Sequence, residues 1–260
     1  MLGMTAQWMG IMGEHANSVA PLLVSTEQGD LKSTFCKSLL PAALQRYYMD
    51  KVDLTSEGRV ERRLAEIGLL NLDEFDKYPS TKMPLLKNLM QMASLSLCKA
   101  YQKNHRSLPR IASFIGTSNR KELLTDPTGS RRFICVMVKR PIDCNGIEHK
   151  QIYAQLKAEI LSGERYWFTK EEEQVLQKNN LSFYRQGPVE DVLRSCYRSV
   201  EKGEEGELRS AAEIFQCLKK KNPSAMRGAN PASLAQILVA VGIERKHTKF
   251  GNVYRVVKIG

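Results

Sequence analysis

The chain has 260 residues, of which 42% are hydrophobic and 26% are charged, and this composition excludes a disordered chain. Its 39 Lys and Arg exceed its 28 Asp and Glu, and the net charge of +11 favours a polyanionic partner such as DNA. No apolar run approaches the roughly 18 residues of a membrane span and no basic, apolar leader opens the chain, so we expect a cytoplasmic protein without a membrane partner.

The first predicted strand covers residues 19–25, and a polar turn leads from it into a helix over 33–40. A phosphate-binding loop places a lysine and a hydroxyl at such a turn, because the lysine neutralises phosphate oxygens and the hydroxyl holds Mg²⁺. Lys32 and Ser33 occupy these positions, which predicts a site for ATP and Mg²⁺. A solvated polar turn would give the same pattern, since only one of the usual glycines is present. The residues assigned to nucleotide binding are Gln28, Gly29, Lys32, Ser33 and Thr34.

A helix over 59–67 precedes the second predicted strand, 68–72, which ends in the adjacent carboxylates Asp73 and Glu74. This pattern is typical of a Walker B element, whose first carboxylate binds Mg²⁺ through water and whose second polarises the attacking water. We therefore expect Asp73 to hold Mg²⁺ together with Ser33, and Glu74 to act as the catalytic base. An acidic helix N-terminus would contain the same residues.

Two further strands are predicted at 110–116 and 133–138. Asn119 follows the first of them, where a polar side chain senses the γ-phosphate in many P-loop ATPases. Arg131 and Arg132 precede the second, and guanidinium groups suit bidentate contacts with phosphate, including a neighbour's nucleotide. A solvated or DNA-facing pair of arginines is the alternative.

These apolar strands are separated by helices, of which the longest is predicted at 83–97. Uniformly apolar strands of this kind indicate a parallel sheet covered on both faces. The sequence therefore predicts an α/β fold.

The basic C-terminal segment is predicted to be a separate domain. Residues 201–207 are polar and contain glycine, so we expect a linker there, between an ATPase domain over 1–200 and a small domain over 208–260. Two helices, at 210–221 and 231–241, and two strands around Gly251-Asn252 predict a winged helix. A basic cap that packs on the ATPase without touching DNA is the alternative. The cations expected to contact DNA are Arg245, Lys246, Lys249 and Arg255.

Two other groups of residues predict no chemistry. Six cysteines and four histidines lack ligand spacing, so we expect reduced thiols and no protein-held metal cluster. The aromatic groups Tyr47-Tyr48 and 166–168 could stack on bases, but we expect them in the core.

Several blocks together resemble the virulence-associated protein E family, over roughly residues 8–200. They are residues 15–24, the Lys-Ser-Thr-Phe-Cys turn at 32–36, Leu-Leu-Asn-Leu-Asp-Glu-Phe at 69–75, residues 111–119, residues 124–133 and residues 163–168. The tail resembles the C-terminal domain of Bacteroides-type members. The resemblance implies a P-loop ATPase akin to superfamily 3 helicases and AAA+ proteins, encoded by prophages and mobile elements.

The resemblance also implies partners. It predicts a homo-oligomer, such as a hexameric ring in which Arg131 or Arg132 reaches the next subunit's nucleotide. Family members often carry a primase-like region upstream, and here we expect it to be absent or encoded separately. One departure is Leu31, which stands where the family pattern has glycine before the lysine and where a side chain could crowd the β-phosphate.

Three functions compete at this point. The first is a DNA-dependent ATPase that works as a helicase-like replication protein of a mobile element. The second, motivated by Leu31, is a non-hydrolysing, nucleotide-regulated DNA-binding factor in replication or packaging. The third, a small-molecule kinase, leaves the basic tail unexplained.

Overall fold

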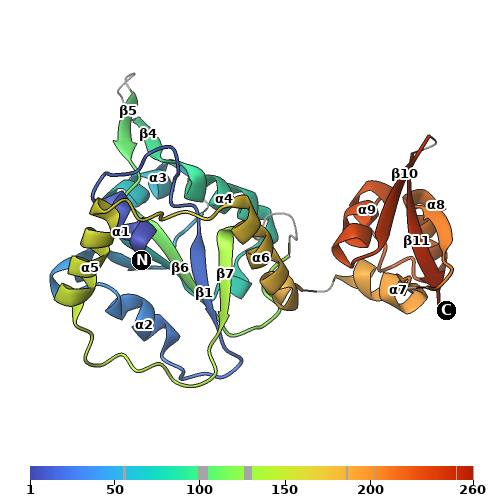
Figure 1. The fold of residues 1–260 in the computed structure, drawn as a ribbon, viewed down its shortest axis with the longest axis horizontal. Helices are drawn as coiled ribbons and strands as arrows, with labels where there is room; N and C mark the ends of the chain where they lie inside the picture. Colours follow the sequence, from blue (N-terminus) through green and yellow to red (C-terminus); the bar gives the residue numbers. More distant parts are fainter. Residues whose placement is uncertain are drawn as a thin grey trace. The chain divides into compact units, whose positions relative to one another are not determined.

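The computed structural model describes residues 1–54, 57–98, 105–125, 131–185, 187–201, 203–249 and 251–259. The chain forms two compact units, Met1–Tyr184 and Arg185–Gly260, and each has its own hydrophobic core (Figure 1). None of the described helices combines the length and apolar character that a bilayer crossing requires.

The larger unit alternates strands and helices along the chain. Its elements are α1 (Leu2–Trp8), β1 (Ala20–Val24), α2 (Lys32–Ser38), β2 (Tyr48–Asp50), α3 (Glu57–Glu66), β3 (Leu69–Leu72), α4 (Met83–Gln91), β4 (Ser94–Cys98), β5 (His105–Pro109), β6 (Ser113–Ser118), β7 (Phe133–Met137), α5 (His149–Leu161) and α6 (Lys170–Asn180). Short 3₁₀ turns at Ala42–Tyr47, Phe75–Lys77, Ser80–Lys82 and Leu181–Phe183 complete it.

Five of these strands form one parallel sheet in the order β2-β3-β6-β1-β7. Parallel register aligns the carboxyl ends of the strands, so Val24 lies beside Ser118, and Leu72 beside Gly116. The predicted α/β fold with a parallel sheet flanked by helices is therefore confirmed. The segments that follow β1, β2, β3 and β6 all leave the sheet at the same edge, the carboxyl edge.

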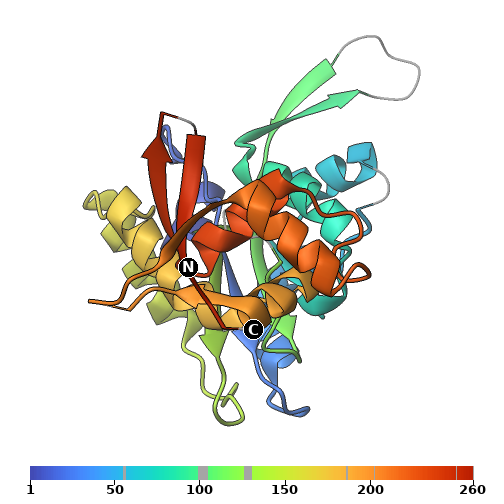
Figure 2. The ribbon, with the colours of Figure 1, turned by 90° about the vertical axis from the view of Figure 1, so that its right-hand side faces the viewer.

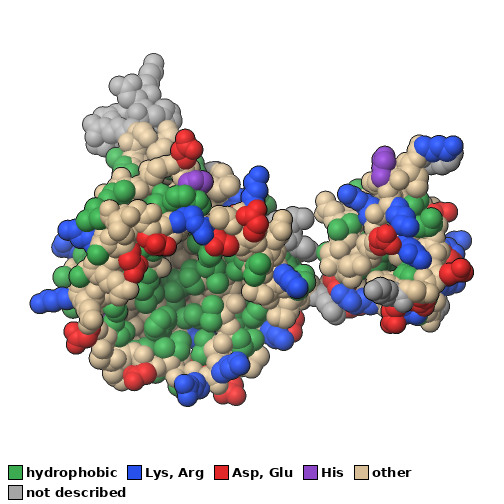
Figure 3. Space-filling model, in the orientation of Figure 1, with side chains coloured by type: hydrophobic (Ala, Val, Ile, Leu, Met, Phe, Trp, Pro, Cys, Tyr) green, Lys and Arg blue, Asp and Glu red, His purple; other side chains and the backbone are tan. Residues whose placement is uncertain are grey.

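Successive side chains of a strand point to opposite faces of the sheet, and both faces carry a hydrophobic core. On one face, Leu22 and Leu70 pack with apolar side chains of α3 and α4. On the other, Leu23 and Ile115 pack with side chains of α1, α2 and α5. Figure 3 shows hydrophobic side chains gathered in a hollow of the larger unit. A cavity of about 370 Å³ on the second face is lined by such residues, among them Ile134.

The structure corrects the bounds of one predicted helix and one predicted strand of the larger unit. The helix predicted to reach residue 97 ends at Gln91, because residues 94–98 form β4, which pairs antiparallel with β5 (Figure 2). The strand predicted to begin at residue 110 begins at Ser113 instead. The prediction of a buried aromatic group at 166–168 was wrong, since Trp167 and Phe168 are 37% and 39% exposed.

The smaller unit contains α7 (Pro188–Cys196), β8 (Tyr197–Ser199), β9 (Glu207–Ser210), α8 (Ala211–Lys221), α9 (Pro231–Ala240), β10 (Glu244–Thr248) and β11 (Gly251–Lys258). Strand β11 pairs antiparallel with β10, β8 and β9. Both predicted helices and the basic hairpin are present, and capping boxes at Ser210 and Asn230 begin the two helices.

The boundary between the units lies earlier than the sequence indicated. Residues 201–207, expected to be a linker, lie within the smaller unit, which begins at Arg185. The physical reason is the core: Leu193 of α7 and Tyr197 of β8 are buried in one cluster with side chains of α8, α9 and β11. The segment 185–200 therefore belongs to the smaller unit and not to the sheet domain.

Candidate nucleotide site at the carboxyl edge of the sheet

The turn between β1 and α2 surrounds the amine of Lys32. This side chain is only 7% exposed, and its Nζ donates to the carbonyl of Glu27 at 3.2 Å. Asp30 fixes the turn, because its carboxylate accepts from Ser25 Oγ and its carbonyl accepts from the amide of Ile142 at 3.2 Å. A buried ammonium group that donates to one backbone carbonyl and forms no ion pair with a carboxylate of the described residues is suited to receive an anion.

The other predicted nucleotide-binding residues lie on the exposed rim around Lys32: Gln28, Gly29, Ser33 and Thr34. Gly29 has a φ of 91°, a conformation that glycine adopts without strain. Leu31 has φ 58° and ψ 23° and caps α2 in the left-handed region. That conformation costs a non-glycine residue about 1–2 kcal/mol. The turn thus keeps a glycine-type backbone at Leu31, whose side chain is 45% exposed.

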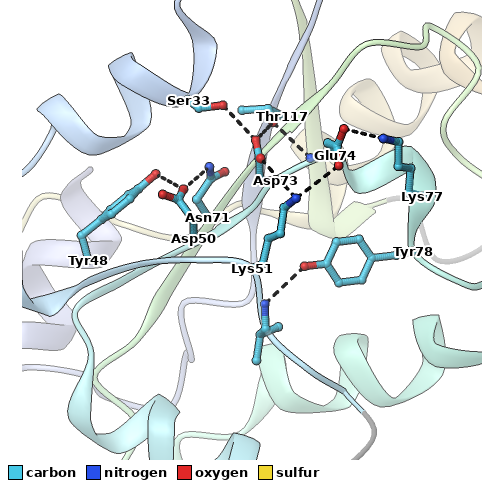
Figure 4. Close-up of polar contacts among 11 residues, drawn as sticks. Ser33, Tyr48, Asp50, Lys51, Asn71, Asp73, Glu74, Lys77, Tyr78 and Thr117 are labelled. Atoms are coloured by element: carbon cyan, nitrogen blue, oxygen red, sulfur yellow. Dashed lines mark hydrogen bonds and ion pairs between the residues drawn. The ribbon is translucent and has the colours of Figure 1, made fainter.

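Asp73 is the centre of the polar contacts at this edge (Figure 4). Its Oδ1 accepts from Ser33 Oγ at 2.8 Å and from Thr117 Oγ1 at 2.6 Å. These residues come from the start of α2, the end of β3 and the end of β6, so the parallel sheet brings together side chains 40 or more positions apart. A hydroxyl and a carboxylate at this spacing are oxygen ligands of the kind that Mg²⁺ prefers.

Glu74 is held by two lysines. Lys51 Nζ lies 3.3 Å from Glu74 Oε2, and Lys77 Nζ binds Oε1. The hydrogen bond from Lys77, and then that from Lys51, lowers the pKa of the Glu74 carboxyl below its ordinary value. The Glu74 amide also donates to Thr117 Oγ1 at 3.3 Å. The carboxylate is therefore ionised but engaged on both oxygens.

Lys51 is positioned by the short strand β2. Asp50, the last residue of that strand, accepts from Tyr48 Oη at 2.7 Å and from the buried Asn71 at 2.9 Å, which fixes β2 to β3. Burial, and then the hydrogen bond to Asp50, raises the pKa of the Tyr48 hydroxyl. The backbone of Lys51 then turns with φ 63°, and its Nζ comes within 4.0 Å of Asp73.

Backbone strain is concentrated at this edge. Among the described residues, the non-glycine residues with positive φ are Leu31, Lys51 and Glu74, and they follow β1, β2 and β3. Such conformations cost on the order of 1–3 kcal/mol each and cluster at functional sites. The strain therefore marks the same edge that the polar contacts mark.

At the end of β6, Thr117 contacts the carboxylate residues and the predicted Asn119 does not. Asn119 lies one residue beyond β6 and is exposed, and no described contact joins its side chain to Asp73 or Glu74. Thr117 contacts both residues instead. The predicted strand ended at residue 116, one residue too early to align Thr117 with the site. For Lys51 the sequence carried no signal, because no strand was predicted at 48–50.

Arg131 and Arg132 lie at the opposite edge of the sheet. They precede β7, whose first residue, Phe133, pairs with Ala20 at the start of β1. Arg131 Nη1 forms an ion pair with Glu173 at 3.2 Å. Five residues of strand, about 16 Å, separate this amino edge from the carboxyl edge. The structure therefore does not bring these arginines to the Asp73 cluster of their own chain. The preceding residues 126–130, part of the predicted turn, lie outside the described residues.

The cations predicted to bind DNA lie on the hairpin of the smaller unit, and two of them form ion pairs with the same carboxylate. Glu244 forms ion pairs with Lys246 at 4.0 Å and with Arg255 at 3.8 Å. Arg245 is opposite Tyr254, so it shares the other face of the hairpin, and Lys249 follows β10. Two of the four predicted cations are thus already paired with a carboxylate.

Comparisons with known proteins identify two segments. A family profile described as the virulence-associated protein E-like domain matches residues 15–185, and one for a domain of unknown function from B. theta (DUF3874) matches residues 186–256. No curated protein matches the chain. The boundary between the two matched segments, at residues 185 and 186, agrees with the division between the two compact units.

Solved structures are similar only at a distance. An apo structure of the NrS-1 C-terminal region (305–718) matches with 11% identity and a TM-score of 0.46, covering 99% of this chain and 71% of that chain. A second apo form of that region matches with 12% identity and a TM-score of 0.41, covering 99% and 70%.

Proposed function

The chain belongs to the family of virulence-associated protein E-like domains, and from this premise we propose that it is a DNA-dependent ATPase, a helicase-like replication protein of a mobile element or prophage. One observation carries the proposal. Ser33, Asp73 and Thr117 meet at the carboxyl edge of a parallel sheet, beside the buried amine of Lys32. Ligands of open α/β sheets bind at this edge.

Each residue of the site has a role in this proposal. The Lys32 amine and the amides of the turn would hold the phosphates of ATP, with Gln28, Gly29 and Thr34 on the rim. Ser33 and Asp73 would hold Mg²⁺, whose charge neutralises the phosphate oxygens. Glu74 would polarise the attacking water once its oxygens are released from Lys51 and Lys77. Asn119, exposed at the end of β6, keeps its proposed role as a γ-phosphate sensor.

The arginines take a role between copies of the chain. Since Arg131 and Arg132 lie at the amino edge, which the length of the strands separates by about 16 Å from the carboxyl edge, they would serve the nucleotide of a neighbouring copy. This arrangement supports a homo-oligomer, such as the hexameric ring that the family resemblance implies.

The smaller unit would supply DNA binding. Its order of elements, α7, β9, α8, α9 and the β10–β11 hairpin, supports a winged-helix interpretation. Of the predicted hairpin contacts, Arg245 would reach phosphate without loss of an ion pair to Glu244, whereas Lys246 and Arg255 would first leave it. Lys249 keeps its proposed contact with DNA beside them.

A second candidate function rests on two observations. Leu31 strains the phosphate turn, and two lysines hold Glu74, so the site could bind nucleotide without hydrolysing it. The chain would then be a nucleotide-regulated DNA-binding factor in replication or packaging.

Phosphate release from ATP and Mg²⁺, with and without single-stranded or duplex DNA, tests the two candidates. Wild type is compared with Lys32→Ala, which removes the buried amine, and with Lys37→Ala, an exposed lysine of α2 away from the site. DNA-stimulated release that only Lys32→Ala abolishes supports the ATPase. Nucleotide binding without release in any condition supports the regulated factor, and absence of nucleotide binding contradicts both.

A further inference from the structure

Most cations on α7 and on the sheet of the smaller unit already have acidic partners. The ion pairs are Arg194–Glu190 at 2.8 Å, Arg198–Glu204 at 2.5 Å, Arg209–Glu207 at 2.7 Å, Arg255–Glu244 at 3.8 Å and Lys246–Glu244 at 4.0 Å. Arg255 Nη2 also donates to the carbonyl of Glu204 at 3.0 Å. A phosphate that binds these groups must compete with a carboxylate, which reduces the net gain.

A second group of cations lacks such partners. Lys219, Lys220 and Lys221 close α8, and Arg227 lies in the connection to α9. All four are exposed, and within the described part of the chain none of them forms an ion pair. Residues 219–243 contain these four cations and no Asp or Glu. The segment therefore presents a charge of +4 that no carboxylate within it neutralises.

The acid that precedes this segment, Glu213, does not neutralise its charge. Glu213 is six residues before Lys219 along α8, about 9 Å in helix rise, and its carboxylate accepts from Ser210 in the capping box. The negative end of the α8 dipole stabilises lysines in its last turn. That effect explains a preference for cations there, but it extends only over the last turn, and Arg227 lies beyond the helix.

The next helix is uncharged. Helix α9 contains no Lys, Arg, Asp or Glu, and Ala232, Gln236 and Val239 are exposed on it. An anionic membrane would require large apolar side chains beside the cations, and these three supply little apolar surface. Among the described residues of α9, Val239 is the one large apolar side chain that is exposed, so an uncharged helix beside four unpaired cations fits a nucleic acid, whose phosphates take the charges, better than a membrane.

We propose that the end of α8 and the α8–α9 connection, residues 219–230, form the main phosphate-binding surface for nucleic acid in this protein, in preference to the β10–β11 hairpin. The inference rests on the proposed DNA-dependent function and assigns the location of its DNA contact. Unpaired lysines release counterions from DNA without breaking an ion pair in the protein.

The test measures DNA affinity of the full chain as a function of salt. The variants are Lys219→Gln/Lys220→Gln/Lys221→Gln and the matched hairpin triple Arg245→Gln/Lys246→Gln/Arg255→Gln, which remove three charges each. For duplex DNA each lost phosphate contact reduces the slope of log K against log salt by about 0.9. We expect the α8 triple to reduce the slope by about 2–3 and to weaken binding at least about tenfold at low salt, and the hairpin triple to change the slope by less than about 1.

Three outcomes overturn the inference. In the first, the hairpin triple lowers the slope and the α8 triple does not. In the second, phosphatidylserine vesicles bind the wild type as tightly as DNA and lose binding in the α8 triple. In the third, the arginine triple Lys219→Arg/Lys220→Arg/Lys221→Arg, which keeps the charge, fails to restore binding, which would assign the loss to folding. If the wild type binds no DNA, the proposed DNA dependence fails as well; if it binds DNA and the α8 triple keeps the wild-type slope, only this inference fails.

Discussion

Leu31 occupies a backbone conformation that glycine adopts without strain, at the turn that surrounds Lys32. In the phosphate-loop pattern the residue before the lysine is glycine, and here it is Leu31. From the sequence, the expected effect is that the Leu31 side chain crowds the phosphates. The structure adds a second effect, because the left-handed backbone is itself strained whatever the side chain does. Substitutions at Leu31 can distinguish the crowding by the side chain from the strain of the backbone.

We expect Leu31→Gly to relieve the strain and the crowding together, and Leu31→Ala to relieve only the crowding. Strain relief of about 1–2 kcal/mol is partly offset by the roughly 0.5–1 kcal/mol that glycine's unfolded-state freedom costs. The free energy of unfolding in urea should therefore rise by up to about 1.5 kcal/mol for glycine and stay level for alanine. Nucleotide affinity, measured by calorimetry, should increase in both if crowding limits binding. An increase in glycine alone would assign the limit to the backbone.

The hydrogen bonds from Lys77 and Lys51 lower the pKa of Glu74, so the pKa of this carboxyl reports on both contacts. The folded pKa is lowered, so these contacts stabilise the fold above the ordinary glutamate pKa and lose that effect as pH falls through the lowered value. We expect Lys77→Gln to raise the Glu74 pKa more than Lys51→Gln does, because the Lys77 hydrogen bond contributes most. Carbon NMR titration of the Glu74 carboxyl measures both variants. Equal shifts, or a shift from Lys51→Gln alone, would contradict this assignment.

Among the elements, β6 is anchored by a buried arginine three residues before its start. Arg110 is 2% exposed, and its guanidinium donates to the carbonyls of Met92 at 2.6 Å, Asn17 at 2.9 Å and Met90 at 3.0 Å, and to that of Ala112. Burial lowers its pKa to about 10. These bonds tie the end of α4 and the segment before β1 to the strand that carries Thr117.

Arg110→Met should destabilise the larger unit by about 3–5 kcal/mol, because it leaves several buried carbonyls without a donor. Arg120→Met is the matched control: its side chain is 70% exposed and forms one ion pair with Asp76, so we expect a change of less than about 1 kcal/mol. Guanidinium unfolding curves measure both. A loss below about 1 kcal/mol for Arg110→Met would show that water replaces the guanidinium without cost.

The elements also show what local pattern can predict. Apolar runs of four to seven residues predicted β1, β3 and β7, because strands buried on both faces need such residues wherever they lie. Residues 94–98 alternate Ser-Leu-Ser-Leu, but they follow a helical pattern without a break, so β4 was missed. Strand β2 has three residues and exists because it pairs with β3, which no local pattern reveals. The site divides in the same way: Lys32, Ser33 and Asp73 carry sequence signals, while Lys51 and Thr117 depend on pairing and register.

At the scale of the whole molecule, the division at Tyr184 and Arg185 determines which pieces fold. The smaller unit buries Leu193 and Tyr197 in its own core, so α7 and β8 are part of it. Composition placed the boundary at residues 201–207, because a polar, glycine-bearing stretch within a domain looks the same as a linker.

We expect residues 185–260 to fold alone and residues 201–260 not to fold. The shorter fragment loses two side chains that are at most 1% exposed, Leu193 and Tyr197, at a cost of roughly 2–5 kcal/mol each. That loss is comparable to the stability of so small a unit. Circular dichroism melts of both fragments measure this, and a cooperative transition in residues 201–260 would contradict the assignment of α7 and β8.

The placement of Arg131 and Arg132 at the amino edge, with Lys32 and Asp73 at the carboxyl edge, allows two kinds of contact between copies that use both. In a contact with two-fold symmetry, the arginines of each copy face the nucleotide site of the other, and the pair is closed. In a head-to-tail contact, every copy offers one edge and receives the other. Such contacts close into a ring or continue as a helical filament, and every contact in them points in the same direction. A ring or filament that couples these two edges head to tail therefore has polarity before it meets any DNA, whereas a two-fold pair has none.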